Sequence, residues 1–110
     1  MPTLVDEHCA PLPAGTPCLA EAQWQVLLGQ LDPAWRVMDG HHLERRWRLA
    51  DFASGLALVN RIGALAEAHD HHPDLLLGWG RVEITLWTHS VGGLSRNDFI
   101  LAAHIDRLTP

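Results

Sequence analysis

The stretch Glu67-Ala68-His69-Asp70-His71-His72-Pro73-Asp74 joins the end of a helical pattern to the start of a strand pattern, and it holds three histidines and three carboxylates. His72 precedes a proline, which pushes its backbone towards extended geometry and away from helix. Imidazole titrates near neutral pH, so histidines presented at a fixed helix end suit proton transfer. The other interpretation is a solvated polar loop, and the rest of the chain decides between the two.

A long helix is predicted directly before this stretch, from Phe52 to about His69, with Asp51 as its N-cap. Its apolar residues fall on two stripes. One stripe comprises Phe52, Leu56, Val59, Gly63 and Ala66, and the other comprises Leu58, Ile62 and Leu65. We expect the first stripe to pack on a sheet and the second to contact another subunit in a homodimer or homotetramer. Gly55 and Gly63 indicate close packing along the same helix.

Four strands are predicted around this helix, arranged as two hairpins. The strands are predicted at residues 35–39, 42–49, 74–80 and 82–89, and alternating apolar and polar residues mark the second and the fourth. A helix over residues 20–31 follows from i, i+3, i+4, i+7 spacing, and a third helix follows the capping-box sequence Ser95-Arg96-Asn97-Asp98. The fold class is therefore α+β, a four-stranded antiparallel sheet with three helices packed on one face, in the order α-β-β-α-β-β-α.

The chain is expected to form one domain over residues 19–110, preceded by an extended arm of residues 1–18 that is rich in Pro, Ala and Gly. The net charge of −5 and the single basic cluster at Arg45, Arg46 and Arg48 argue against nucleic-acid binding. We expect a cytoplasmic protein with reduced cysteines, since no apolar run reaches membrane-spanning length and the N-terminus lacks a secretory-signal pattern.

Three groups of residues resemble the pterin-4a-carbinolamine dehydratase family in its bacterial type, over residues 19–108. They are Glu67-x-x-Asp70-His71-His72-Pro73, Val82-x-Ile84-x-Leu86-x-Thr88-His89 and Gly93-Leu94-Ser95-x-x-Asp98. The resemblance implies a dehydratase, a carbon–oxygen lyase, that removes water from 4a-hydroxytetrahydropterin and gives quinonoid dihydropterin. Such an enzyme recycles the cofactor of aromatic amino-acid hydroxylases. The resemblance also implies a pterin substrate, no metal or organic cofactor, and a functional link to phenylalanine hydroxylase.

The resemblance assigns the site residues as well. The catalytic histidines fall on His71, His72 and His89. The substrate-binding residues fall on Glu67, Asp70, Pro73, Trp87, Thr88, Ser90 and Asp98. Dehydration needs an acid for the leaving hydroxyl and a base for the N5 proton, and imidazoles can fill both roles near pH 7, although the sequence does not say which histidine is which. His69 and Asp74 stay outside the site, and Leu75 replaces an aromatic residue that many members carry.

Two alternatives use the same residues. Some relatives act as dimerisation cofactors for transcription factors or as assembly chaperones, so a non-catalytic binding role is the main alternative, and the retained histidines favour the enzyme. The second alternative is a metal site built from His69, His71, His72 and His89. It is disfavoured because adjacent side chains on extended backbone point to opposite faces.

Overall fold

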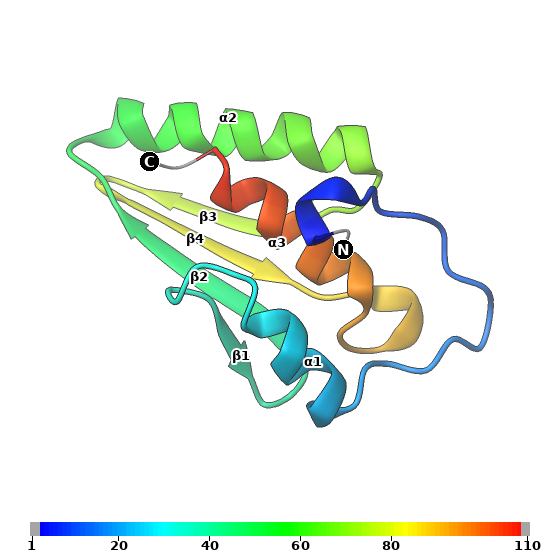
Figure 1. Cartoon of the computed structure of the whole chain (residues 1–110). Coiled ribbons are helices and arrows are strands. Elements are labelled where there is room, and N and C mark those ends of the chain that lie inside the picture. The colour runs from blue at the N-terminus through cyan, green and yellow to red at the C-terminus, as the bar shows by residue number, and fades with distance from the viewer. Residues whose placement is uncertain (1–2, 109–110) are drawn as a thin grey trace.

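The computed structural model describes residues 3–108, which form a four-stranded sheet with helices over one face (Figure 1). In chain order the elements are the 3₁₀ turn η1 (Leu4–Asp6), α1 (Glu21–Leu28), β1 (Arg36–Met38), β2 (His42–Arg48), α2 (Phe52–His69), β3 (Asp74–Gly78), β4 (Arg81–Leu86), the 3₁₀ turn η2 (His89–Val91) and α3 (Arg96–Asp106). The strand order is β1-β2-β4-β3, with every neighbouring pair antiparallel. The predicted α+β class is confirmed.

The two faces of the sheet differ as the alternation predicts. Leu43 of β2 lies opposite Leu86 of β4, and both are fully buried beneath the helices with Ile84. On the other face Arg46 makes ion pairs with Glu44 and Glu83, at 3.1 and 3.3 Å. One face therefore forms the core and the other carries charge, because successive side chains on a strand alternate between the faces.

The long helix α2 has its expected span, but Leu58 and Ile62 of the second stripe are buried, and of the first stripe Ala66 is buried as expected. Asp51 caps it, with its side chain accepting a hydrogen bond of 2.8 Å from the Ser54 N–H. Leu58 and Ile62 are 2% and 0% exposed in the core, whereas Phe52 and Leu56 are 44% and 43% exposed. The expectation that Leu58 and Ile62 face another subunit is wrong. Periodicity identifies two stripes, but only packing shows which of them faces the sheet.

Gly55 lies where α2 approaches the sheet closely, beside the buried stripe of Leu58 and Ile62. A Cβ at Gly55 would lie 2.9 Å from Leu77 Cδ1 and 3.4 Å from Leu49 Cδ1, so the missing side chain lets α2 approach the sheet on the side of Leu58. Gly63 does not share this role, because a Cβ there would meet no atom of residues 3–108 within 4 Å outside its own helix. The prediction of close packing thus holds at Gly55 and is wrong at Gly63.

Several elements are shorter than the sequence pattern indicates. Helix α1 ends at Leu28 rather than residue 31, although Leu31 remains buried beyond the helix end. Strand β4 ends at Leu86 rather than His89. The reason is local: Thr88 bonds across to Gly93 through both its backbone N–H and its C=O, and His89 begins η2. His89 therefore stands on a tight turn instead of a strand end.

The N-terminal arm forms no helix or strand between η1 and α1, and its first part is docked on the domain. Figure 1 shows its blue segment beside α3. Leu4 is 1% exposed within the core, and Glu7 forms two short bonds to the Arg96 guanidinium of α3, at 2.8 and 2.6 Å. The Glu7 carbonyl also lies 2.8 Å from His104 Nε2. Residues before α1 thus belong to the packed structure.

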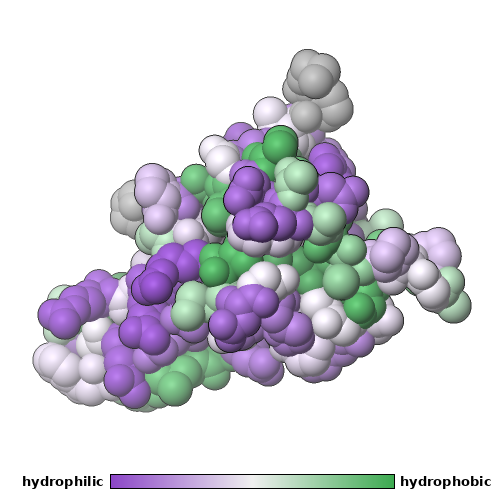
Figure 2. All heavy atoms as spheres, turned by 90° about the horizontal axis from the view of Figure 1, so that it is seen from below, coloured by the Kyte–Doolittle hydropathy of each residue, from purple (hydrophilic) through white to green (hydrophobic). Residues whose placement is uncertain are grey.

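The surface of the molecule is mixed in character. On the face that Figure 2 shows, hydrophobic groups near the middle are bordered and interrupted by hydrophilic ones. Of the helices within residues 3–108, none combines the length and the apolar character needed to cross a membrane.

Candidate active site

The end of α2 separates the two adjacent histidines. Asp70 adopts the left-handed conformation with φ 49° and ψ 42°, a conformation that favours glycine and is tolerated by Asp. Its N–H donates to the Glu67 carbonyl and the His71 N–H donates to the Ala66 carbonyl, which closes the helix as a Schellman motif. The chain then turns through His72 towards β3. As a result the His71 side chain is 11% exposed and that of His72 is 55% exposed.

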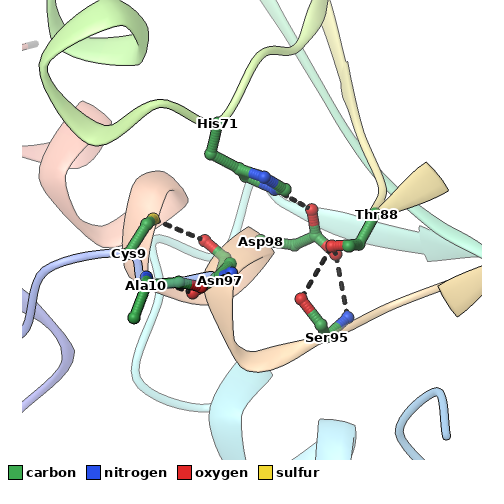
Figure 3. Close-up of polar contacts among 7 residues, drawn as sticks. All are labelled: Cys9, Ala10, His71, Thr88, Ser95, Asn97 and Asp98. Carbon is green, nitrogen blue, oxygen red and sulfur yellow. Dashed lines mark hydrogen bonds and ion pairs between the residues drawn. The ribbon is translucent and has the colours of Figure 1, made fainter. Parts of the chain in front are cut away.

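His71 rests on a fully buried carboxylate (Figure 3). Its Nε2 lies 2.6 Å from Asp98 Oδ1. The other oxygen, Asp98 Oδ2, accepts bonds of 2.9 Å from the Thr88 hydroxyl and from the Ser95 N–H. Because the Thr88 hydrogen goes to Asp98, the Ser95 hydroxyl donates to Thr88 over 2.7 Å. The Asp98 carboxylate thus accepts from three groups, which fix its position. In this position it orients the His71 ring and can stabilise a positive charge on that ring.

Helix α3 supplies this carboxylate through its cap. Ser95 is the N-cap residue and Asp98 the third helical residue, so the bond from the Ser95 N–H to Asp98 is the reciprocal half of the predicted capping box. The same residue that closes the first turn of α3 thereby supports a histidine 27 positions earlier in the chain.

His72 and His89 approach from more open positions. His72 Nε2 contacts Glu67 Oε2 in an exposed pair. His89 begins η2, and its ring stacks on Trp87 with centroids 3.9 Å apart and planes at 22°. His41, from the β1–β2 turn, packs on the same indole at 4.6 Å. Trp87 thus sets the orientation of the His89 ring.

The expected site residues converge on one hollow of about 320 Å³. Its lining comprises Asp70, His71, His72, Trp87, Thr88, His89 and Ser90. Glu67 and Asp98 are outside the lining, each in contact with one of its histidines, and the half-buried Pro73 follows His72, also outside the lining. The structure therefore brings all three expected catalytic histidines to one ligand-sized space.

His69 lies in a cluster with His8 and His104, apart from the lining of the hollow. Its ring stacks on His8 at 4.1 Å and contacts the tilted ring of His104 at 4.5 Å, and its Nδ1 accepts a 3.1 Å bond from the Cys9 N–H. Burial lowers the pKa of His69, and the neighbouring His104, His8 and His71 lower it further. Burial raises the pKa of the neighbouring Cys9 thiol to about 12, with a contribution from Asp98.

Within residues 3–108, no three His, Cys, Asp or Glu side chains are grouped to hold a metal ion.

The sequence indicated neither the contact of His41 with Trp87 nor the docking of the arm. Residues 8–12 of the arm line a second cavity, of about 490 Å³, which shares Asp70, His71, Thr88 and Ser90 with the hollow. No local pattern encodes this, because the arm is held by residues that lie far along the chain.

The chain is thus a small α+β protein in which three histidines line one hollow of about 320 Å³. Residues 17–108 match the family described as pterin 4 alpha carbinolamine dehydratase. The chain belongs to this family.

Similar proteins cover nearly the whole chain. A protein of Rubrobacter xylanophilus, provisionally named a pterin-4-alpha-carbinolamine dehydratase, is 46% identical and is matched over 98% of this chain and 100% of its own length. A protein of Alkaliphilus metalliredigens with the same provisional name is 44% identical, over 97% of this chain and 96% of its own. The arm therefore lies largely within the matched region of these relatives, although it precedes the family match.

Two solved structures share the fold. One is a transcriptional coactivator/pterin dehydratase from Brucella melitensis, with a TM-score of 0.78 and 29% identity, covering 84% of this chain and 99% of that one. The other is a pterin dehydratase-like protein identified as a RuBisCO assembly factor in the α-carboxysome, with a TM-score of 0.58 and 26% identity, covering 68% and 88%. The fold thus occurs in proteins described by catalytic and by non-catalytic roles.

Proposed function

We propose that this protein dehydrates 4a-hydroxytetrahydropterin to quinonoid dihydropterin. One observation carries the proposal: His71, His72 and His89 line a single hollow, and His71 is backed by the buried, fully bonded Asp98. Three imidazoles that face one space provide both a proton donor and a proton acceptor near neutral pH.

In the proposed reaction the C4a–O bond breaks as the hydroxyl takes a proton and leaves as water. N5 loses its proton, and the electron pair of the N–H bond forms the C4a=N5 double bond. His71 suits the base: with Nε2–H donated to Asp98, a neutral ring has its lone pair on Nδ1, and the imidazolium formed afterwards is stabilised by the carboxylate. We assign the acid to His72 or His89, which reach the hollow from its open side.

The other site residues hold the substrate in this scheme. The carboxylates of Glu67 and Asp70 are the acceptors suited to the amino-pyrimidinone edge, and Trp87 offers a flat apolar surface. Pro73 directs the chain after His72, and Ser90 supplies a hydroxyl at the rim. Asp98 and Thr88 are buried and bonded to each other, so we propose that they act through His71 rather than by touching the pterin.

The direct test is turnover of freshly generated 4a-hydroxytetrahydropterin, measured above the spontaneous rate, with and without EDTA. We expect acceleration that EDTA does not reduce, together with substoichiometric metal in the purified protein. Dehydration at the spontaneous rate would overturn the enzyme assignment, and a zinc ion lost together with activity would overturn the metal-free mechanism.

A binding role is the second candidate, favoured by the exposed apolar residues Phe52 and Leu56 on α2. Solved relatives are described as a coactivator and as an assembly factor. We propose that the exposed stripe with Phe52 and Leu56, rather than the buried Leu58 and Ile62, mediates a homodimer or homotetramer.

With the pterin chemistry we also propose a cytoplasmic location and a functional link to phenylalanine hydroxylase.

A further inference from the structure

The cavity under the N-terminal arm adjoins the histidine-lined hollow directly. The two spaces share Asp70, His71, Thr88 and Ser90, and the second cavity continues from them to residues 8–12 of the arm. Its walls differ in character: Ala10, Pro11 and Leu12 are apolar, whereas the shared residues are polar. A ligand seated against the histidines can therefore extend into a space with one apolar wall.

The wall is held in a defined place by Asn97. The Asn97 side-chain amide accepts a 3.1 Å bond from the Ala10 N–H and donates a 2.8 Å bond to the Ala10 carbonyl, as a backbone partner in a sheet would. The Cys9 thiol adds a 3.3 Å bond to the Asn97 carbonyl (Figure 3). Asn97 precedes Asp98, so adjacent residues of α3 position the arm and His71.

The chemistry of the proposed reaction links these two spaces. N5, which loses its proton to the site, is bonded to C6, and C6 carries the substituent by which natural tetrahydropterins differ. When N5 faces the histidines, the substituent starts from the adjacent ring atom, two bonds from N5, and needs a neighbouring space. The cavity under the arm adjoins the hollow at His71 itself.

We propose that Pro11 and Leu12 form the wall that receives the C6 substituent of the pterin, so that the arm sets selectivity among tetrahydropterins. This inference rests on the proposed function. The wall residues precede residues 17–108, which the family model matches, so the wall stands outside the domain that defines the family. The carbons of a short hydroxyalkyl group suit Pro11 and Leu12, and its hydroxyls suit Ser90, which lines both spaces.

Two substitutions at Leu12 test the wall with a pair of substrates, the 4a-hydroxytetrahydropterins bearing a methyl or a dihydroxypropyl group at C6. Leu12→Trp narrows the cavity and should lower kcat/KM for the dihydroxypropyl substrate about tenfold or more, with the methyl substrate changed less than about twofold. Leu12→Ala should raise KM for the dihydroxypropyl substrate about threefold to fivefold without changing kcat. Pro13→Ala is the matched control, because Pro13 is exposed on the same arm and outside the cavity lining.

The two proposals fail in different ways. If wild-type protein is active but both Leu12 variants leave the ratio of the two kcat/KM values unchanged, or shift both substrates equally, the wall is overturned and the dehydratase remains. If wild-type protein is inactive on both substrates, the proposed function is overturned. Calorimetric titration with 7,8-dihydropterins bearing the same two groups then tests the Pro11–Leu12 wall without turnover. Leu12→Ala should change the ratio of the two dissociation constants. An unchanged ratio would overturn the proposal that this wall receives the C6 substituent.

Discussion

His71 and His72 are adjacent in sequence and each contacts a carboxylate, yet the two pairs differ in environment. His71 and Asp98 are 11% and 0% exposed at their side chains, and two further donors fix the carboxylate. His72 and Glu67 are 55% and 76% exposed. Solvent screens the second pair, which is expected to contribute little to stability, whereas the first is preorganised by the fold. The two adjacent histidines therefore have different environments: His71 is nearly buried against a buried carboxylate, and His72 is exposed to solvent.

The largest effect is expected at the buried histidine. His71→Ala should lower kcat by about 100-fold or more, since it removes a positioned proton-transfer group, and His72→Ala and His89→Ala should each lower it by at least about tenfold. The measurement is single-turnover dehydration above the spontaneous rate, with circular dichroism to confirm folding. Wild-type rates in all three variants would remove the histidines from the mechanism.

Changing the carboxylates sharpens the contrast between the pairs. Asp98→Asn should lower kcat by about 100-fold, because a neutral amide no longer stabilises the charged His71 ring. Glu67→Gln should change kcat less than about fivefold, since the exposed charge is already screened. Equal losses in the two variants, measured in the same assay, would show that burial does not distinguish the pairs.

The same contrast between buried and exposed positions applies along α2. Ile62→Glu places a charge in the core and should cost more than about 4 kcal/mol of unfolding free energy, enough to prevent stable folding. Leu56→Glu changes an exposed residue and should alter stability by less than about 0.5 kcal/mol while shifting the oligomer towards monomer. Urea denaturation and light scattering measure the two effects. A folded Ile62→Glu protein would place that stripe outside the core.

The two cysteines extend the comparison to the arm. Cys9 is buried with its pKa raised to about 12, and Cys18 is exposed. Iodoacetamide at pH 8 should modify Cys18 at least about tenfold faster than Cys9, because the thiolate is the reacting form. Mass spectrometry should show one adduct per native chain and two in urea. Rapid double labelling of the native protein would mean that the arm is not docked.

The smallest expected effect is a pH dependence of stability from His69. Its folded-state pKa is lowered by burial and neighbouring histidines, so the unfolded chain binds a proton that the folded chain does not. Stability is then fully present above about pH 6.5 and is lost as pH falls below that value. Urea midpoints at pH 7.5 and 5.5 measure the loss. His69→Gln should reduce the difference, and an unchanged difference would exclude His69 as its source.

Local patterns accounted for most of the helices and strands. The alternation in β2 and β4 identified the buried Leu43, Ile84 and Leu86, and the capping box correctly placed the start of α3. These features could be predicted because periodicity and capping depend on residues only a few positions apart. The family resemblance, rather than any local pattern, named all seven residues that line the hollow.

The sequence by itself determined the class of fold, the span of α2, the cap of α3 and the histidines that meet at the site. Only the tertiary structure decided which stripe of α2 is buried, which histidine rests on a buried carboxylate, and where the arm docks. The physical reason is separation along the chain. His71 meets Asp98 across 27 residues, and Ala10 meets Asn97 across 87, so these contacts depend on how whole elements pack rather than on any local pattern.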